Sequence, residues 1–256
     1  MEKGSYVAVS GMLAAQRKLD TLTNNLANLS TPGFKADQMT FESYLAKSGR
    51  GEATPEQAGP TAGDTEYVAT TGTYTNFEQG SIRTTGNPLD VALKGDGFLA
   101  VMTYEGERYT RAGRLQVAED GALVTGDGHP VLDASNRMIF VNDKLVTIDD
   151  DGSVWLTDNE DRDGEVLSAG KMKLVTPIDM KRLHKEGNGL FSVPDGEEIF
   201  TASNIRVVQG SLEGSNVNMI KEMTDIIMGQ RMAETYKKIV QQNDQLTTTL
   251  ILQVGR

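Results

Sequence analysis

The chain has 256 residues, 38% of them hydrophobic, a formal net charge of −11 and no cysteine. This length suffices for one large domain or two modest ones, and the apolar fraction allows a buried core. The missing cysteines exclude disulfides, thiolate catalysis and cysteine-ligated metals, and the acidic balance argues against nucleic acid, whose binding requires phosphate neutralisation.

The negative charge lies in the middle of the chain. Residues 1–29 and residues 215–256 each sum to +1, which leaves −13 for the residues between them. Near-neutral ends can pack closely against like ends, whereas an acidic middle suits a solvated surface.

The N-terminal segment predicts a helix from about Ser5 to Leu29. Its apolar residues alternate in spacing between three and four, which is the seam of a coiled coil: Met12, Ala15, Leu19, Leu22, Leu26 and Leu29. Pro32 and Gly33 end the helix. The first residues lack the basic and apolar regions of a cleaved signal peptide, and no run of residues is apolar enough to span a membrane.

Three asparagines lie close together near the end of this helix, at Asn24, Asn25 and Asn28. Together they cost the helix about 2 kcal/mol relative to alanine. They fall off the apolar seam, so they either mark a frayed helix end or make lateral hydrogen bonds to a neighbouring subunit or chain segment. We favour lateral bonding, because it would explain the cost.

The middle of the chain predicts antiparallel β-structure. Residues 49–64 have the composition of a loop, and from about Thr65 the hydrophobic period becomes two. Asp-Gly pairs, which suit tight hairpin turns, recur at residues 96–97, 120–121, 127–128, 151–152, 163–164 and 195–196. The clearest hairpins are residues 117–124 and 150–155, and residues 89–102 predict two strands around Gly95-Asp96-Gly97.

The C-terminal segment predicts a second helix from about Val217 to Gln253, with Asn216 or Asn218 as its N-cap. Its larger apolar residues form a stripe with irregular spacing: Ile220, Ile227, Tyr236, Ile239, Leu246 and Leu250. A helix of this length needs its apolar side covered. We therefore expect the two terminal helices to pair with each other or with copies in an assembly, which gives an α+β fold with an all-β middle.

No motif in the sequence indicates catalysis. Residues 159–164 imitate the start of an EF-hand loop, but the expected bidentate glutamate is Gly170, so we interpret this segment as a solvated hairpin tip. The chain has no P-loop, nucleophile elbow or dinucleotide fingerprint. We expect no catalytic residue, no metal and no cofactor.

Four stretches of the sequence resemble the flagellar rod and hook family. They are residues 24–35 (NNLANLSTPGFK), residues 85–98 (TGNPLDVALKGDGF), residues 109–113 (YTRAG) and residues 210–218 (GSLEGSNVN). The resemblance extends over essentially the whole chain in the family's order. The opening Tyr6–Met12 segment is most similar to the proximal rod subunit, and the distal rod subunit comes next.

The resemblance implies an inner coiled-coil domain (1–30 and 215–256), an extended linking segment (31–88 and 200–214) and an outer β-rich domain (89–199). It also implies export through the flagellar secretion channel without a cleaved signal, and assembly in the periplasmic part of the basal body. The implied partners are copies of the chain, other rod proteins, the distal rod, the hook, the bushing rings and the export apparatus. Asn24, Asn25, Asn28, Pro32, Gly33 and Phe34 would contribute family-motif or lateral contacts.

The sequence leaves other functions open. The chain could be a distal-rod or hook-type subunit, or an extracellular binding module that oligomerises through its helices. A glycan hydrolase hidden in the β-rich middle would need convergent carboxylates, which the sequence alone does not place.

Overall fold

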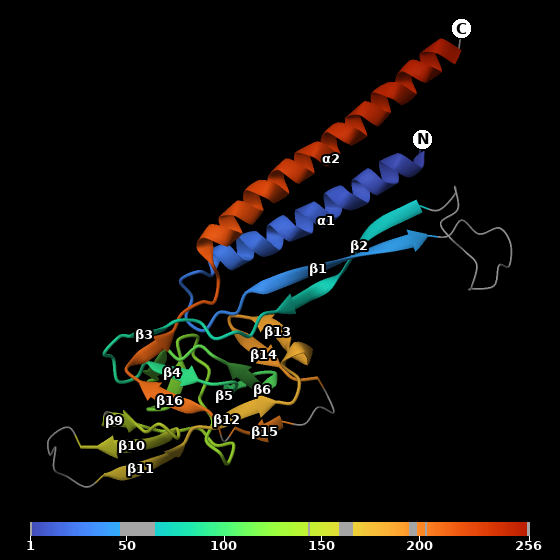
Figure 1. The fold of residues 1–256 in the computed structure, drawn as a ribbon. Coiled ribbons are helices and arrows are strands. Elements are labelled where there is room, and N and C mark those ends of the chain that lie inside the picture. The colour runs from blue at the N-terminus through green and yellow to red at the C-terminus, as the bar shows by residue number, and fades with distance from the viewer. Residues whose placement is uncertain are drawn as a thin grey trace, which may run out of the picture. The chain divides into compact units, whose positions relative to one another are not determined.

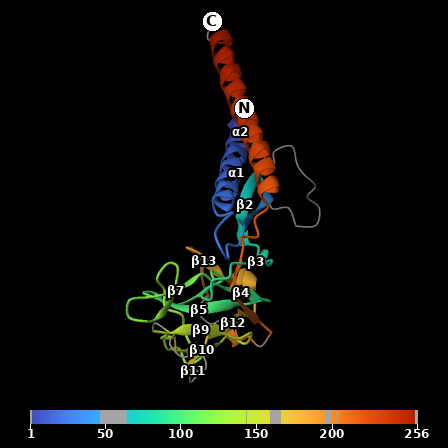
Figure 2. The same ribbon diagram turned by 90° about the vertical axis from the view of Figure 1, so that its left-hand side faces the viewer.

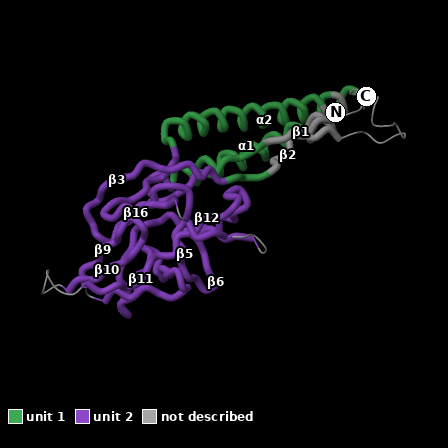
Figure 3. Tube along the Cα trace, turned by 60° about the horizontal axis from the view of Figure 1, so that its bottom comes forward, with its two compact units in different colours: residues 1–27, 37–74, 218–256 green, residues 28–36, 75–217 purple. Residues whose placement is uncertain are grey.

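The computed structural model describes residues 2–46, 65–142, 144–158, 166–194, 199–202 and 204–254. It forms two compact units, each built from separated stretches of the chain (Figure 3). The helical unit comprises Met1–Ala27, Asp37–Tyr74 and Asn218–Arg256, and the β unit comprises Asn28–Ala36 and Thr75–Val217. The expected linking residues are thus divided between the two units, and the loop expected at residues 49–64 lies outside the described residues.

The helical unit pairs two long helices, as expected. Helix α1 spans Glu2–Ala27 and α2 spans Met219–Val254, and the two lie side by side (Figures 1 and 2). Strands β1 (Asp37–Ala46) and β2 (Thr65–Thr75) form a two-stranded sheet, and β1 packs against α1. Asn218 caps α2, because its side-chain oxygen accepts a hydrogen bond from Lys221 N at 3.2 Å. None of the described helices is long and apolar enough to cross a membrane.

The two helices run antiparallel. Gly11 lies against the ring of Tyr236, Leu19 lies against Gly229, and Asn25 reaches Glu222. Residue numbers therefore rise along α1 as they fall along α2. The α+β fold class is confirmed.

The β unit consists of short strands in small sheets. Its largest sheet has six strands in the order β13-β14-β6-β5-β12-β15, and a three-stranded sheet has the order β11-β10-β9. The pairs β16-β4, β17-β3 and β7-β8 complete the unit. Every one of these strand pairings is antiparallel. A single 3-10 turn, η1 (Met180–Arg182), interrupts the strands in the described part of the unit.

The strands of the β unit have the following bounds: β3 Ile82–Thr84, β4 Val91–Lys94, β5 Phe98–Thr103, β6 Gly106–Thr110, β7 Leu115–Val117, β8 Leu123–Thr125, β9 Leu145–Ile148, β10 Ser153–Thr157, β11 Leu167–Lys171, β12 Leu174–Pro177, β13 His184–Gly187, β14 Leu190–Ser192, β15 Ile199–Thr201, β16 Arg206–Gln209 and β17 Ser211–Glu213.

The two largest clusters of buried side chains in the described part of the β unit form most of its core. The larger is aliphatic and includes Val91, Val101, Leu123 and Val154. The smaller is centred on Phe98 and Phe191, whose ring centroids lie 5.5 Å apart, with Phe77 packed against both. Such aromatic contacts add to the stabilisation from burial.

Several predicted hairpins are present. Gly121 and Gly152 have φ values of 82° and 86° at the turns of the β7–β8 and β9–β10 hairpins, where Asp-Gly pairs predicted them. The strands predicted on either side of Gly95-Asp96-Gly97 also form. They do not pair with each other, because β4 pairs with β16 whereas β5 pairs with β6 and β12. The pairs at 163–164 and 195–196 lie outside the described residues.

The Asp151 carboxylate gives the β unit a small stability term that depends on pH. It accepts hydrogen bonds from Lys171 Nζ at 2.8 Å and from Ser153, and these bonds lower the pKa of Asp151 to about 2. Because the folded pKa lies below the unfolded one, this stabilisation is complete above about pH 4 and is lost as the pH falls towards 2. The pair is about half exposed, so we expect Asp151→Asn to cost under about 1 kcal/mol at pH 7. Urea titrations should show this difference shrinking as the pH falls towards 2 and disappearing only below the folded pKa.

Candidate assembly surfaces and a buried ion cluster

The predicted seam of α1 faces the inside of the helical unit. Leu22 is buried, and Met12, Leu19 and Leu26 are half-buried. Small residues, Ala8, Gly11, Ala14 and Ala15, are buried on the same side. Their small size lets the neighbouring backbone approach closely.

The predicted stripe of α2 mostly faces away from α1. Ile220, Ile227, Ile239 and Leu246 are exposed, with Ile220 at 76%, so within one chain they do not pair with the α1 seam as expected. Most of the less exposed positions of α2 follow a regular alternation of four and three: Glu222, Ile226, Gly229, Ala233, Tyr236, Val240 and Asn243, with Asp225 half-buried beside them. Of the predicted residues whose side chains are described, Tyr236 alone belongs to this set. The prediction followed large apolar residues, whereas the contact face combines apolar residues with small and polar ones.

Leu29 is not in the helix, which ends at Ala27, and instead it packs in the β unit against Phe34, Ala36 and Val217. The chain turns there, with Thr31 N donating to Asn28 O at 3.2 Å. The side chain of Leu250 lies outside the described residues.

Gly11 provides a direct test of the helix pair. A Cβ at this position would lie 2.7 Å from two ring atoms of Tyr236, and a rigid ring cannot yield as an aliphatic chain end can. We expect Gly11→Val to destabilise the pair by about 1–3 kcal/mol, measured by far-ultraviolet circular dichroism during urea unfolding. Gln16→Val, at an exposed position of α1, is the control and should change stability by under about 0.5 kcal/mol. Equal effects of the two variants would contradict this packing.

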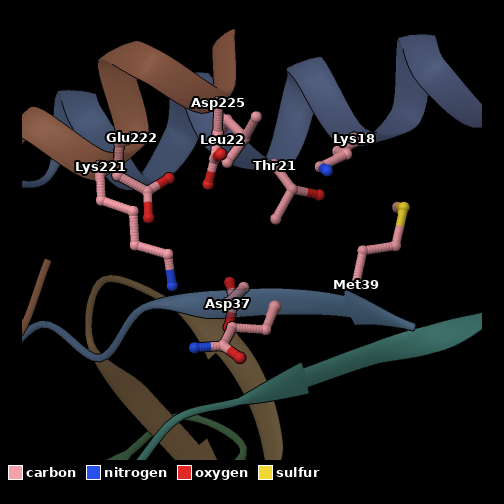
Figure 4. A pocket seen from close by; sticks show the side chains of 9 residues that line it. Lys18, Thr21, Leu22, Asp37, Met39, Lys221, Glu222 and Asp225 are labelled. Carbon is pink, nitrogen blue, oxygen red and sulfur yellow. The ribbon is translucent and has the colours of Figure 1, made fainter. Parts of the chain in front are cut away.

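A polar cavity of about 170 Å³ lies within the helical unit, where side chains from α1, α2 and β1 converge (Figure 4). Lys18, Thr21 and Leu22 reach it from α1, Lys221, Glu222 and Asp225 from α2, and Asp37, Gln38 and Met39 from β1. The cavity combines both signs of charge, as a solvated ionic contact would. Burial raises the pKa of Glu222 above its ordinary value, and the hydrogen bond from Asn25 opposes this shift.

Asn25, one of the three clustered asparagines, links three elements of the helical unit. It is 1% exposed. Its Oδ1 accepts from Asp37 N at 2.9 Å, and its Nδ2 donates to Asp37 O at 2.8 Å and to Glu222 Oε2 at 3.4 Å. Asn25 thus bonds a neighbouring chain segment. Asn24 is exposed, and Asn28 accepts a hydrogen bond from the Thr31 hydroxyl. The lateral role of these asparagines in an assembly stays a prediction.

The motif that follows α1 is buried in the β unit. Gly33 has a φ of 70° and its amide donates to Glu213 O at 2.8 Å. The Phe34 ring is buried beneath the ammonium of Lys185, 4.1 Å from the ring centroid. Pro32 is half-buried beside them.

Lys35 leads from this motif into a fully buried ion cluster with Glu213 and Arg111. Lys35 Nζ lies 2.8 Å from Glu213 Oε1, and Arg111 Nη1 lies 3.2 Å from Glu213 Oε2, with all three side chains at 0–1% exposure. Burial lowers the pKa of Lys35, and repulsion from Arg111 acts in the same direction, whereas Glu213 opposes both. Two cations thus share one carboxylate.

Backbone groups complete this cluster. Lys35 Nζ donates to Glu78 O at 2.7 Å, Gly80 N donates to Glu213 Oε1 at 2.9 Å, and Arg111 Nη2 donates to Gly95 O at 2.6 Å. The Arg111 guanidinium also lies over the Phe98 ring. All four stretches that carry the family resemblance therefore meet in one buried cluster.

The sequence reasoning did not single out Lys35, Arg111 or Glu213. A signal was available, because each is a charged residue inside a stretch otherwise rich in glycine and in apolar or small polar residues. Charged residues are rarely fully buried unless they are paired. Groups of three or more potential metal ligands do not occur among the described residues. The EF-hand-like residues 159–164 lie outside the described residues.

Comparison with known proteins identifies the family. Residues 6–35 match the family described as flagella basal body rod protein, residues 92–156 the flagellar hook protein FlgE/F/G D1 domain, and residues 208–254 the flagellar basal body rod FlgEFG protein C-terminal region. The chain is 32% identical to the flagellar basal-body rod protein FlgF of Caulobacter vibrioides, over 100% of this chain and 99% of that protein.

Two further relatives show the same full-length similarity. The flagellar basal-body rod protein FlgG of Bacillus subtilis is 32% identical over 98% of both chains. FlgF of Salmonella typhimurium is 31% identical over 96% of this chain and 95% of that protein. The family profiles and these relatives span both terminal helices and the β-rich middle, and the chain belongs to the flagellar basal-body rod protein family.

Proposed function

We propose that this chain is a structural subunit of the flagellar basal-body rod, in its proximal part, and that copies assemble head-to-tail into a helical tubular shaft that transmits torque. The observation that carries this proposal is the exposed apolar residues along much of α2. Family membership supplies the context in which such residues would be covered.

The exposed apolar residues of α2 form two stripes, each with the seven-residue spacing found in helix seams. Ile220 and Ile227 form the first, and Met232, Ile239 and Leu246 form the second, which lies on another side of the helix because the two are offset by five residues. All five are at least 40% exposed in the single chain. Covering such a side chain contributes up to about 1.5–3 kcal/mol, so the two stripes favour association.

Helices of other copies, or of related rod proteins, would cover these stripes. Contacts between different surfaces of identical subunits do not close on themselves and so extend into a filament. In this assembly Met12, Leu19, Leu22 and Leu26 hold α1 on α2 within each subunit, while the exposed stripes of α2 make the contacts between subunits. The β unit then supplies the lateral contacts and the stiffness.

The wider setting of the rod follows from this proposal. Partners would be other rod proteins, the distal rod, the hook, the surrounding rings and the export apparatus. Assembly would take place in the periplasm after export without a cleaved signal. The subunit would need no catalytic residue, metal or cofactor.

A distal-rod role is the second candidate, because a FlgG protein is as similar to this chain as a FlgF protein is. The test expresses the chain in two strains of one flagellated bacterium, lacking either the proximal or the distal rod gene. Restored swimming in the first strain alone supports the proximal role, and restoration in the second alone supports the distal role. Failure in both, with the chain expressed and exported, would contradict a rod function.

Solution behaviour distinguishes a rod subunit from a helix-oligomerised binding module. A rod subunit should form monomers or open polymers, with helicity that rises on assembly because much of α2 is uncovered in one chain. Light scattering that shows a discrete closed oligomer, such as a trimer, would instead favour the binding module.

A further inference from the structure

The chain passes between the two units four times, after residues 27, 36, 74 and 217. Each passage is a single stretch of backbone. Within the β unit, the segments next to these passages are residues 28–36, residues 75–80 and residues 211–217, and these three segments are joined directly to one another.

Asn216 makes the first set of hydrogen bonds between these segments. Its Oδ1 accepts from Ala36 N at 2.8 Å, and its Nδ2 donates to Asn76 O at 2.8 Å and to Glu78 O at 3.1 Å. Asn76 N donates to Ala36 O at 2.8 Å. One amide side chain therefore joins all three segments.

The ion cluster of Lys35, Glu213 and Arg111 makes the second set of bonds between the three segments. Lys35 Nζ bonds both Glu78 O and Glu213 Oε1, and Glu213 also accepts from Gly80 N. Each of these bonds joins two of the three segments, and the charged partners strengthen them. Arg111, the residue that follows β6, donates a hydrogen bond to the other carboxylate oxygen of Glu213.

The composition of the cluster indicates that it fixes the positions of the segments as well as stabilising the fold. With two cations and one anion, its formal charge is positive, and the Nε of Arg111 has no hydrogen-bond partner in the described structure. Buried ion pairs are often no more stabilising than apolar residues of similar size, and their best-attested use is to fix one register. Apolar side chains would not bond the backbone groups of three separate segments.

We propose that Lys35, Glu213 and Asn216 are positioning residues that join the segments through which the chain enters and leaves the β unit, so that a load on one segment is shared by all three. The sharing of load between the segments rests on the proposed rod function. The joining of the segments does not, and the two are tested separately.

Hydrogen exchange of the purified full chain tests whether the three segments are held together by these bonds. The variants are Lys35→Met, which leaves Glu213 paired with Arg111, and Asn216→Ala, which leaves the ion cluster intact. Either variant should speed amide exchange at least tenfold in all three segments, residues 33–36, 76–80 and 211–217, with β5 unchanged. Lys171→Met is the control, because it removes the same group from the exposed Lys171–Asp151 pair, and it should leave the three segments unchanged. Faster exchange confined to the segment that carries the substitution would overturn the proposal.

Swimming under load tests the mechanical consequence in cells whose own copy of this gene is deleted. Cells that express either variant should carry normal numbers of flagella and swim at near wild-type speed in buffer, but lose most of that speed in viscous medium. The Lys171→Met control should swim like wild type in both media. Fewer flagella, with the same relative speed at every viscosity, would overturn the load-sharing role. If the wild-type chain fails to restore swimming, the rod function fails, and the exchange experiment still decides whether the three segments are held together.

Discussion

Replacing Glu213 with leucine is expected to lower the free energy of unfolding by about 3–5 kcal/mol, because the change strands two buried cations. Arg111 would keep its charge at 1% exposure without the shared carboxylate, and Lys35 would lose the partner that opposes the lowering of its pKa by burial. Gly80 N would also lose its acceptor. Urea unfolding followed by the fluorescence of Trp155, the single tryptophan of the chain, measures this loss in the β unit.

Glu105→Leu is the matched control for this prediction. Glu105 also pairs with an arginine, Arg108, but its side chain is 75% exposed. Exposed pairs contribute about 0–1 kcal/mol, so this variant should unfold almost like the wild type. A Glu213→Leu variant as stable as Glu105→Leu would show that the buried cations find other partners, and would remove the energetic basis of the cluster.

Gly33→Ala is expected to cost about 2–5 kcal/mol. The residue has a φ of 70°, which costs an L-residue with a Cβ about 1–2 kcal/mol. The new Cβ would also lie 2.3 Å from the backbone oxygen of Arg111, so backbone would have to move, with a further cost of about 1–3 kcal/mol. Thermal or urea unfolding of the full chain measures the sum.

Gly86→Ala separates the two causes. Gly86 has a similar φ of 77°, but a Cβ there would meet nothing within 4 Å. This variant should show the conformational cost alone, about 1 kcal/mol. If both alanine variants lost the same stability, the close approach of Gly33 to Arg111 would not matter.

The sequence predicted those elements whose signals lie within a short stretch of the chain. Helix α1, the hairpin at Gly121 and the cap at Asn218 each follow from short-range chemistry, and each is present. The boundary of α1 was placed too late by two residues, because a turn that starts at Asn28 ends the helix before Pro32 does.

The contact face of α2 could not be found in the same way. Hydrophobicity ranks Ile227 above Gly229, but the pairing of two helices also depends on how closely their backbones approach. Gly229 and Ala233 allow that approach, whereas Ile227 is left exposed. Which stripe of a long helix faces its partner is decided by a segment far away in the chain.

The ion cluster was missed for a related reason. Lys35, Arg111 and Glu213 lie in three separate motifs. The lone charge in each motif is a local signal, but nothing local shows that these three charges are one another's partners. Resemblance marked these stretches as belonging to a family. The resemblance did not show that the three charged side chains are bonded to one another, because that requires the distances between their atoms.

The bond between Asn25 and Glu222 has a consequence for how the molecule forms. These residues are 197 positions apart, so the first helix has to wait for nearly the whole polypeptide before its partner is available. Contacts of such separation carry a large closure entropy and form slowly. The packing of the two helices against each other should therefore be the last step of folding, after the hairpins of the β unit have formed.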